Sequence, residues 1–100
     1  MPKIIEYFGF TFYFYANEHL PIHVHVSYAE YESVFELFFE EGILTDIQVR
    51  KVENLQGLPA KQLKEAGKVV EEFASYIAES WLDFFVLNKK ITIKKITKKI

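Results

Sequence analysis

The sequence predicts an α+β fold in which an antiparallel β-meander of about five strands packs on one long C-terminal α-helix. Between about residues 3 and 52, apolar and polar residues alternate in five segments, which is the two-residue period of half-buried strands. From about residue 59 to 87 the apolar period changes to steps of three and four, as in an amphipathic helix. A Lys-rich segment, residues 88–100, closes the chain. With no linker or repeat in the sequence, we expect one domain over residues 1–100.

Turn signals divide the first half of the chain into strands. Gly9 separates two short strands, and Pro21 ends a polar break before the third, because proline lacks a backbone donor. The predicted strands are Lys3–Tyr7, Phe10–Tyr15, Ile22–Tyr28, Ser33–Phe39 and Ile43–Val52.

The hydrophobic pattern selects one register between the third and fourth strands. If Tyr28 pairs with Tyr31, Val24 faces Phe35, so that apolar residues oppose one another. A slip by one residue would put Glu36 beside an inward valine. We therefore expect the unslipped register.

A three-residue hairpin loop, Glu40–Gly42, is predicted before the fifth strand, with Gly42 in the left-handed conformation. Alternation then places four residues of that strand on the core side: Ile43, Thr45, Ile47 and Val49.

The helix is predicted to open at Leu58 and Pro59, because proline is favoured in the first turn. A straight helix to residue 87 would be about 40 Å long, longer than a domain of this size is wide. We expect a bend near Gly67, or an overhanging apolar end around Trp81 that packs on a partner. The predicted core stripe is Leu63, Ala66, Val70, Phe73, Ile77, Trp81 and Phe84.

Composition narrows the class of protein. The chain has no cysteine, which excludes disulfides and thiolate metal sites. Its first residues lack the apolar run of a signal peptide, and no apolar stretch approaches the roughly 18 residues of a membrane span. We expect a cytoplasmic protein without a membrane association.

Charge is distributed unevenly. Residues 4–49 contain no Lys or Arg, whereas residues 88–100 contain no acid. Lysines in such a tail can neutralise phosphates and give salt-dependent affinity for nucleic acid. The interpretation we favour is a solvated tail attracted to the acidic half, and complementary patches for a partner or a second copy stay open. The candidate nucleic-acid or partner surface is Lys94, Lys95, Lys98 and Lys99.

The histidines are the chain's candidate site. In a strand, His23 and His25 point to the same side about 7 Å apart, and the predicted register puts Glu36 opposite His23. The following hairpin is expected to put Asp46 opposite Glu36. This set could hold a divalent metal, zinc or manganese, or could support acid–base catalysis by His23, His25 and Glu36. The simpler interpretation is an exposed strand face, on which histidine is an ordinary residue.

A motif of the form E-H-x-P-x-H-x-H covers the histidines. Together with the hairpin after Tyr28, the helix start at Leu58 and Trp81 near the helix end, it gives a pattern that resembles the bacterial family called domain of unknown function 4160 (DUF4160). The chain departs from the family's common pattern at Ala29 and Glu30, where many members have a glycine-rich turn. The motif residues are Glu18, His19, Pro21, His23 and His25.

The resemblance implies a small prokaryotic protein whose site lies in the motif. Members of the family are thought to be encoded beside another small family, and this pairing suggests a toxin–antitoxin system. A purely structural role is the alternative, in which His19 and Pro21 only set the turn between two strands.

Two functions follow from these observations. The first, which we favour, is a protein-interaction module of a two-component system that binds a small protein encoded nearby or a second copy. The alternative is a metal-dependent or acid–base enzyme, acting for example on nucleic acid, centred on His23, His25 and Glu36.

Overall fold

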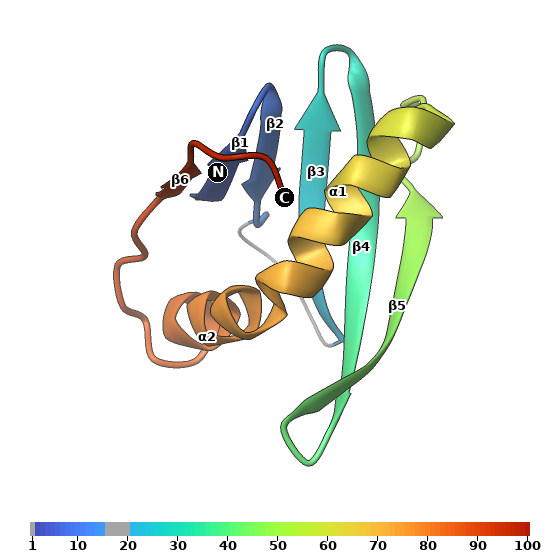
Figure 1. Cartoon of the computed structure of the whole chain (residues 1–100). Helices are drawn as coiled ribbons and strands as arrows, with labels where there is room; N and C mark the ends of the chain where they lie inside the picture. The colour runs from blue at the N-terminus through green and yellow to red at the C-terminus, as the bar shows by residue number, and fades with distance from the viewer. Residues whose placement is uncertain (1, 16–20) are drawn as a thin grey trace.

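The computed structural model describes residues 2–15 and 21–100, which form a six-stranded sheet and two helices (Figure 1). The strand order is β5-β4-β3-β2-β1-β6, and the first five strands form the predicted antiparallel meander. In chain order the elements are β1 (Lys3–Tyr7), β2 (Phe10–Tyr13), β3 (Ile22–Tyr28), β4 (Tyr31–Glu40), β5 (Ile43–Lys51), α1 (Ala60–Glu72), α2 (Ala74–Phe85) and β6 (Lys94–Ile96).

The pairing of β3 with β4 has the predicted register. Tyr28 pairs with Tyr31, and Val24 lies opposite Phe35. Both Val24 and Phe35 are buried, because this face of the sheet packs against the helices. The hydrophobic pattern of the two strands was therefore sufficient to determine their register.

The turn between β4 and β5 differs from the prediction. Glu40 pairs with Ile43, so the turn consists only of Glu41 and Gly42, and the predicted three-residue loop is wrong. The φ angles of Glu41 and Gly42 are 50° and 81°, which suits the two-residue hairpin turn that needs two left-handed residues. The left-handed conformation predicted for Gly42 is confirmed.

A β-bulge interrupts the pairing of β4 with β5. Phe38 pairs with Asp46, but Phe39 pairs with Leu44, which leaves Thr45 as the extra residue of β5. A bulge of this kind shifts the alternation of the bulged strand by one residue.

The bulge changes which residues of β5 face the helices. Ile47 and Val49 lie opposite core residues of β4, as predicted. Leu44 takes the place nearer the turn, so the predicted inward positions of Ile43 and Thr45 are wrong. Ile43 is 69% exposed.

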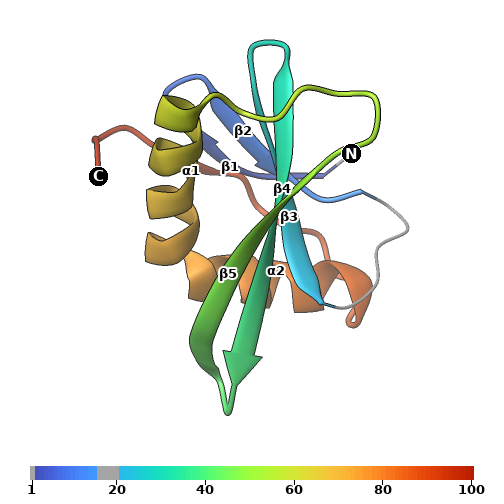
Figure 2. The ribbon, with the colours of Figure 1, turned by 90° about the vertical axis from the view of Figure 1, so that its right-hand side faces the viewer.

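The helical segment is two helices rather than the predicted single one. It breaks at Phe73, with φ −109° and ψ 24°, although the Phe73 N–H still donates to the Val69 carbonyl at 2.9 Å. The break is not at Gly67, which lies within α1. The longest dimension of the molecule is 33 Å, too short for a straight helix of about 40 Å. In Figure 2, α2 turns sharply away from α1.

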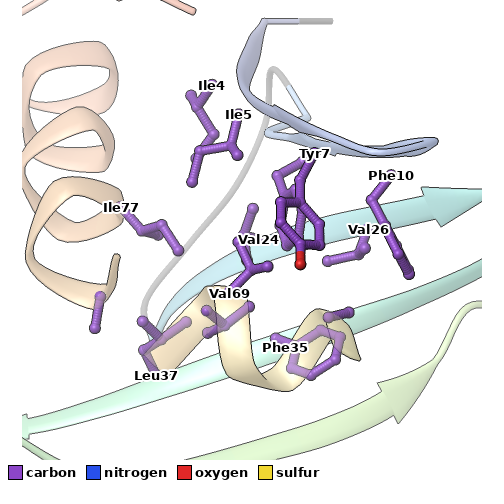
Figure 3. Packing of buried hydrophobic residues seen from close by; sticks show 14 of the residues in the cluster. Ile4, Ile5, Tyr7, Phe10, Val24, Val26, Phe35, Leu37, Val69 and Ile77 are labelled. Carbon is purple, nitrogen blue, oxygen red and sulfur yellow. The ribbon is translucent and has the colours of Figure 1, made fainter. Parts of the chain in front are cut away.

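One hydrophobic core fills the space between the sheet and the helices (Figure 3). Val69 of α1 and Ile77 of α2 both reach it. Trp81 is also buried, and Phe14 stacks on Phe84, so much of the predicted overhanging helix end packs on its own sheet. The exposed apolar residues at this end are Leu82, Val86 and Leu87.

The Lys-rich tail contains one short strand. β6 runs parallel to β1 and pairs Lys94 with Ile5 and Ile96 with Tyr7. The Ile100 N–H donates to the Tyr7 hydroxyl at 3.2 Å, which holds the last residue against β1. Within the described residues, no helix is long and apolar enough to cross a membrane.

Replacing Gly67 by alanine is expected to stabilise the protein by about 0.5–1 kcal/mol, because glycine weakens a helix interior. A Cβ at this position would lie 3.8 Å from the Phe35 ring, an ordinary contact distance. Gly42→Ala is the matched control and should destabilise by about 1 kcal/mol, since its φ is 81°. Urea unfolding measures both. A loss of stability in Gly67→Ala would contradict a continuous α1.

Candidate functional site

His23 and His25 lie on the face of the sheet that is turned away from the helices. They alternate along β3 with Val24 and Val26, which belong to the core. Each histidine is only 4% exposed, so their interpretation as members of an exposed strand face is wrong. The side chains that contact them therefore determine what they can do.

A buried carboxylate is the centre of this polar face. Glu32, at the start of β4, is 9% exposed and accepts hydrogen bonds from the hydroxyls of Tyr13 and Tyr15, the latter at 2.8 Å. The Nδ1 atom of His25 lies 3.4 Å from Oε2 of Glu32, the oxygen that accepts the Tyr15 hydrogen bond. Two hydroxyls and one imidazole thus converge on one carboxylate, which offsets the cost of burying its charge.

The imidazole rings are held by aromatic contacts. The His25 ring stacks on Tyr15, with 3.8 Å between the ring centroids, and on Tyr13, with 5.6 Å. His23 packs edge-on against His25 at 5.7 Å. His23 Nδ1 lies 2.7 Å from the Pro21 carbonyl oxygen. Because a carbonyl only accepts, His23 carries a proton on Nδ1, and a neutral ring presents Nε2 as its acceptor.

The hydroxyl of Tyr13 stays protonated in this environment. Burial, and then the hydrogen bond to Glu32, raise the pKa of Tyr13 well above its ordinary value. Tyr13 can therefore donate a hydrogen bond at physiological pH, but it cannot act there as a base or as a phenolate ligand.

A shallow hollow of about 450 Å³ adjoins the carboxylate. Its walls carry an ammonium group, hydroxyls and the buried acid, so a polar ligand would find both donors and acceptors there. The lining residues are Lys3, Thr11, Tyr13, Ser27 and Glu32.

The predicted set of four metal ligands is not assembled. His23 does pair with Glu36, as predicted, but Glu36 pairs on its other side with Gln48 rather than Asp46. Because of the shorter turn and the bulge, Asp46 lies opposite Phe38 of β4, and its carboxylate accepts hydrogen bonds from the Ile47 N–H and from Gln48. Glu36 itself lies 3.3 Å from Arg50. The expected juxtaposition of Glu36 with Asp46 is therefore wrong.

No three His, Asp or Glu side chains gather closely enough to hold a metal ion within residues 2–15 and 21–100. Two motif residues, Glu18 and His19, lie outside the described residues. Metal binding by His23 and His25 stays a prediction.

The sequence analysis missed the central residue of this face, Glu32, and both tyrosines that bind it. A signal was present in the predicted register, because pairing Tyr28 with Tyr31 also pairs Ser27 with Glu32 on the histidine side. In β2, alternation likewise predicts that Tyr13 points to the other side of the strand from the core residue Phe12. Burial of the carboxylate could not be read from the pattern, because an acid at a strand start is usually solvated.

The lysines of the tail make contacts within the chain. The ammonium group of Lys94 lies 5.1 Å from the centre of the Tyr76 ring, and that of Lys99 lies 4.5 Å from the centre of the Phe8 ring and 3.7 Å from Glu65. These contacts are with α1, α2 and the β1–β2 hairpin. Lys95 pairs in register with Glu6 of β1. Binding of nucleic acid by Lys94, Lys95, Lys98 and Lys99 stays a prediction.

Glu32→Ala is expected to cost about 2–3 kcal/mol of unfolding free energy, because it leaves two tyrosine hydroxyls without their acceptor. Glu36→Ala is the matched control: its ion pair with the half-exposed Arg50 should contribute at most about 1 kcal/mol. Denaturant titration of both variants gives the comparison. Equal losses of unfolding free energy would mean that the hydrogen bonds of Glu32 with Tyr13 and Tyr15 add no stability.

The fold and this polar face can now be compared with known proteins. A family model described as Domain of unknown function (DUF4160) matches residues 9–82, from the β1–β2 turn to α2. No curated protein and no solved structure matches the chain significantly. The matched region contains β2 to β5, the buried histidines and Glu32, whereas β1 and β6 lie outside it. The chain therefore belongs to the DUF4160 family.

Proposed function

We propose that this protein is a protein-interaction module that takes up a strand of another chain at the β5 edge of its sheet. β5 ends the sheet and has nine residues, most of them exposed. An edge strand offers a row of backbone donors and acceptors, and adding a strand to such an edge is a common mode of protein recognition. This exposed edge is the single observation that carries the proposal.

The opposite edge of the sheet is less suited to this role. It is formed by β6, which has only three residues, and this strand covers the edge of β1. Figure 1 shows β5 on the open side of the sheet, with the β4–β5 hairpin extending beyond the helices.

The side chains of β5 also favour pairing with a strand of another chain. Natural edge strands discourage pairing with charges, prolines, β-bulges or short length. β5 has the bulge at Thr45 and two charged residues at its end, but it is long, contains no proline and exposes two apolar residues, Ile43 and Val49, the latter 46% exposed. Its bulge at Thr45 leaves a regular stretch from Asp46 to Lys51.

The partner we propose is a small protein encoded nearby, in a two-component system of the toxin–antitoxin kind. The resemblance of the motif to its family suggests this pairing. A module of this kind needs no catalytic group, so the buried histidines then serve the sheet itself through the Tyr15 stack and the Pro21 hydrogen bond.

Val49→Lys is expected to weaken capture of the co-expressed neighbouring protein by at least about tenfold, because a lysine on an edge strand disfavours pairing. Val86→Lys is the matched control, since Val86 is 62% exposed but lies after α2. Co-purification followed by calorimetric titration gives the affinities. An equal effect of both variants would contradict the role of β5.

A second candidate is an acid–base or metal-dependent enzyme that acts on a small polar ligand. It is favoured by one observation: the Glu32 carboxylate contacts His25 and borders the hollow. In this function Glu32, rather than Glu36, orients the imidazole of His25. His23 and His25 would supply the nitrogen ligands of a zinc or manganese ion.

Metal analysis of the untagged protein tests the metal-dependent form of this candidate. This candidate requires about one zinc or manganese ion per chain. The ion should be lost in the double variant His23→Ala/His25→Ala and kept in Glu36→Ala. Circular dichroism should confirm that the double variant is folded. Protein that is metal-free and takes up no added zinc or manganese contradicts metal dependence.

A further inference from the structure

We infer that β5 pairs with β5 of a second copy, antiparallel and with Gln48 on the two-fold axis. This inference rests on the proposed function and names the occupant of the same edge in the free protein. The two sheets would join into one continuous sheet, with the helices of both copies on the same side.

Symmetry limits the registers that two β5 strands can adopt. Two antiparallel copies of one strand in a continuous sheet are related by a two-fold axis perpendicular to the sheet. Such an axis passes through one residue and its counterpart, and residues that face each other lie on the same side of the sheet. Each register is therefore defined by the residue at the axis.

Charge selects among these registers. With Gln48 on the axis, Asp46 of each copy faces Arg50 of the other, so two opposite-charge pairs form. With Ile47 or Val49 on the axis, neither Asp46 nor Arg50 faces an opposite charge. An axis at Asp46 or at Arg50 would place like charges directly opposite.

The Asp46–Arg50 pairs would extend a contact that the single chain already makes. Asp46, Gln48 and Arg50 lie on the face of β5 that is turned away from the helices, because they pair with Phe38, Glu36 and Val34. Arg50 lies 3.3 Å from Glu36 of its own chain. A guanidinium group has donors on several sides, so it can also reach Asp46 of the second copy.

In the same register, the side chains on the helix side of β5 also complement those of the second copy. Ile47 of one copy faces Val49 of the other, and this pairing would cover two apolar side chains that the chain leaves partly exposed. Beyond these pairs, Lys51 of the second copy would come beside the bulge at Thr45. Lys51 shares the helix side of the strand with Val49.

A hollow beside β5 lies where that lysine would come. It has a volume of about 310 Å³, and the acidic residue Glu71 of α1 is among its lining residues. An ammonium group from the second copy would therefore meet negative charge on the helix side too. The complementary charges lie on both faces of the same register. The residues that line the hollow are Leu44, Thr45, Asp46, Ile47 and Glu71.

A strand pair of this length is at the small end of stable interfaces, so we expect dimerisation that depends on concentration. Sedimentation velocity from about 5 to 500 µM should show the 11.8 kDa chain shifting from monomer to dimer. A protein that stays monomeric over this range overturns the inference.

Charge exchange tests the register. Asp46→Arg and Arg50→Asp each put like charges opposite one another, so each variant alone should dimerise at least about tenfold more weakly. An equimolar mixture of the two variants restores opposite charges at both pairs and should form a heterodimer with at least the wild-type affinity. A mixture that stays monomeric, or single variants that dimerise normally, overturns the inference.

Disulfide trapping tests the same register without changing a charge pair. Because the chain has no cysteine, Gln48→Cys introduces one thiol, and two such thiols on the axis are within disulfide reach. The matched control Thr45→Cys, which changes no charge, places its two thiols about 20 Å apart. Rapid oxidation of Gln48→Cys alone supports the inference. Equal oxidation of both variants, or of neither, overturns it.

These outcomes are separate from those of the proposed function. A monomeric protein that still captures its neighbour through Val49 overturns the self-pairing and leaves the proposed function in place. A dimer trapped through Gln48→Cys that captures no other protein supports the self-pairing and contradicts the two-component role.

Discussion

The register of β3 on β4 is the constraint on which the rest of this molecule depends. Val24 opposite Phe35 places an apolar surface beneath α1 and α2, and any slip by one residue would turn that surface toward solvent. Because strand residues alternate, the same register necessarily places His25 and Glu32 on the other face. The core and the polar face are thus two results of one pairing.

The polar face is stable because its groups satisfy one another. Glu32 accepts hydrogen bonds from two tyrosine hydroxyls, and His25 both contacts its carboxylate and stacks on the Tyr15 ring. A carboxylate buried without such donors would be costly. The same contacts that hold Glu32 in place also explain how histidines can be buried in a strand without belonging to the hydrophobic core.

Two local features determine which side chains β5 presents at the edge of the sheet. The two-residue turn at Glu41 and Gly42 and the bulge at Thr45 together set which side chains β5 turns toward the helices. Leu44 and Ile47 of β5 pack against the core, but most residues of the strand stay exposed. An exposed strand that carries opposite charges four residues apart, Asp46 and Arg50, is an element to which another strand can add. The interaction function proposed for the protein depends on that geometry.

The sequence by itself determined the strands of the meander, the β3–β4 register and the family, because these depend on periodicity, on turn residues and on a local motif. Only the tertiary structure decided the break at Phe73, the bulge at Thr45 and the burial of Glu32 with Tyr13. The helical segment breaks because an unbroken helix would be longer than the molecule. The residue at the break, Phe73, does not itself predict a break. A carboxylate is buried only when hydroxyls from a neighbouring strand reach it, and this depends on how the whole sheet is assembled.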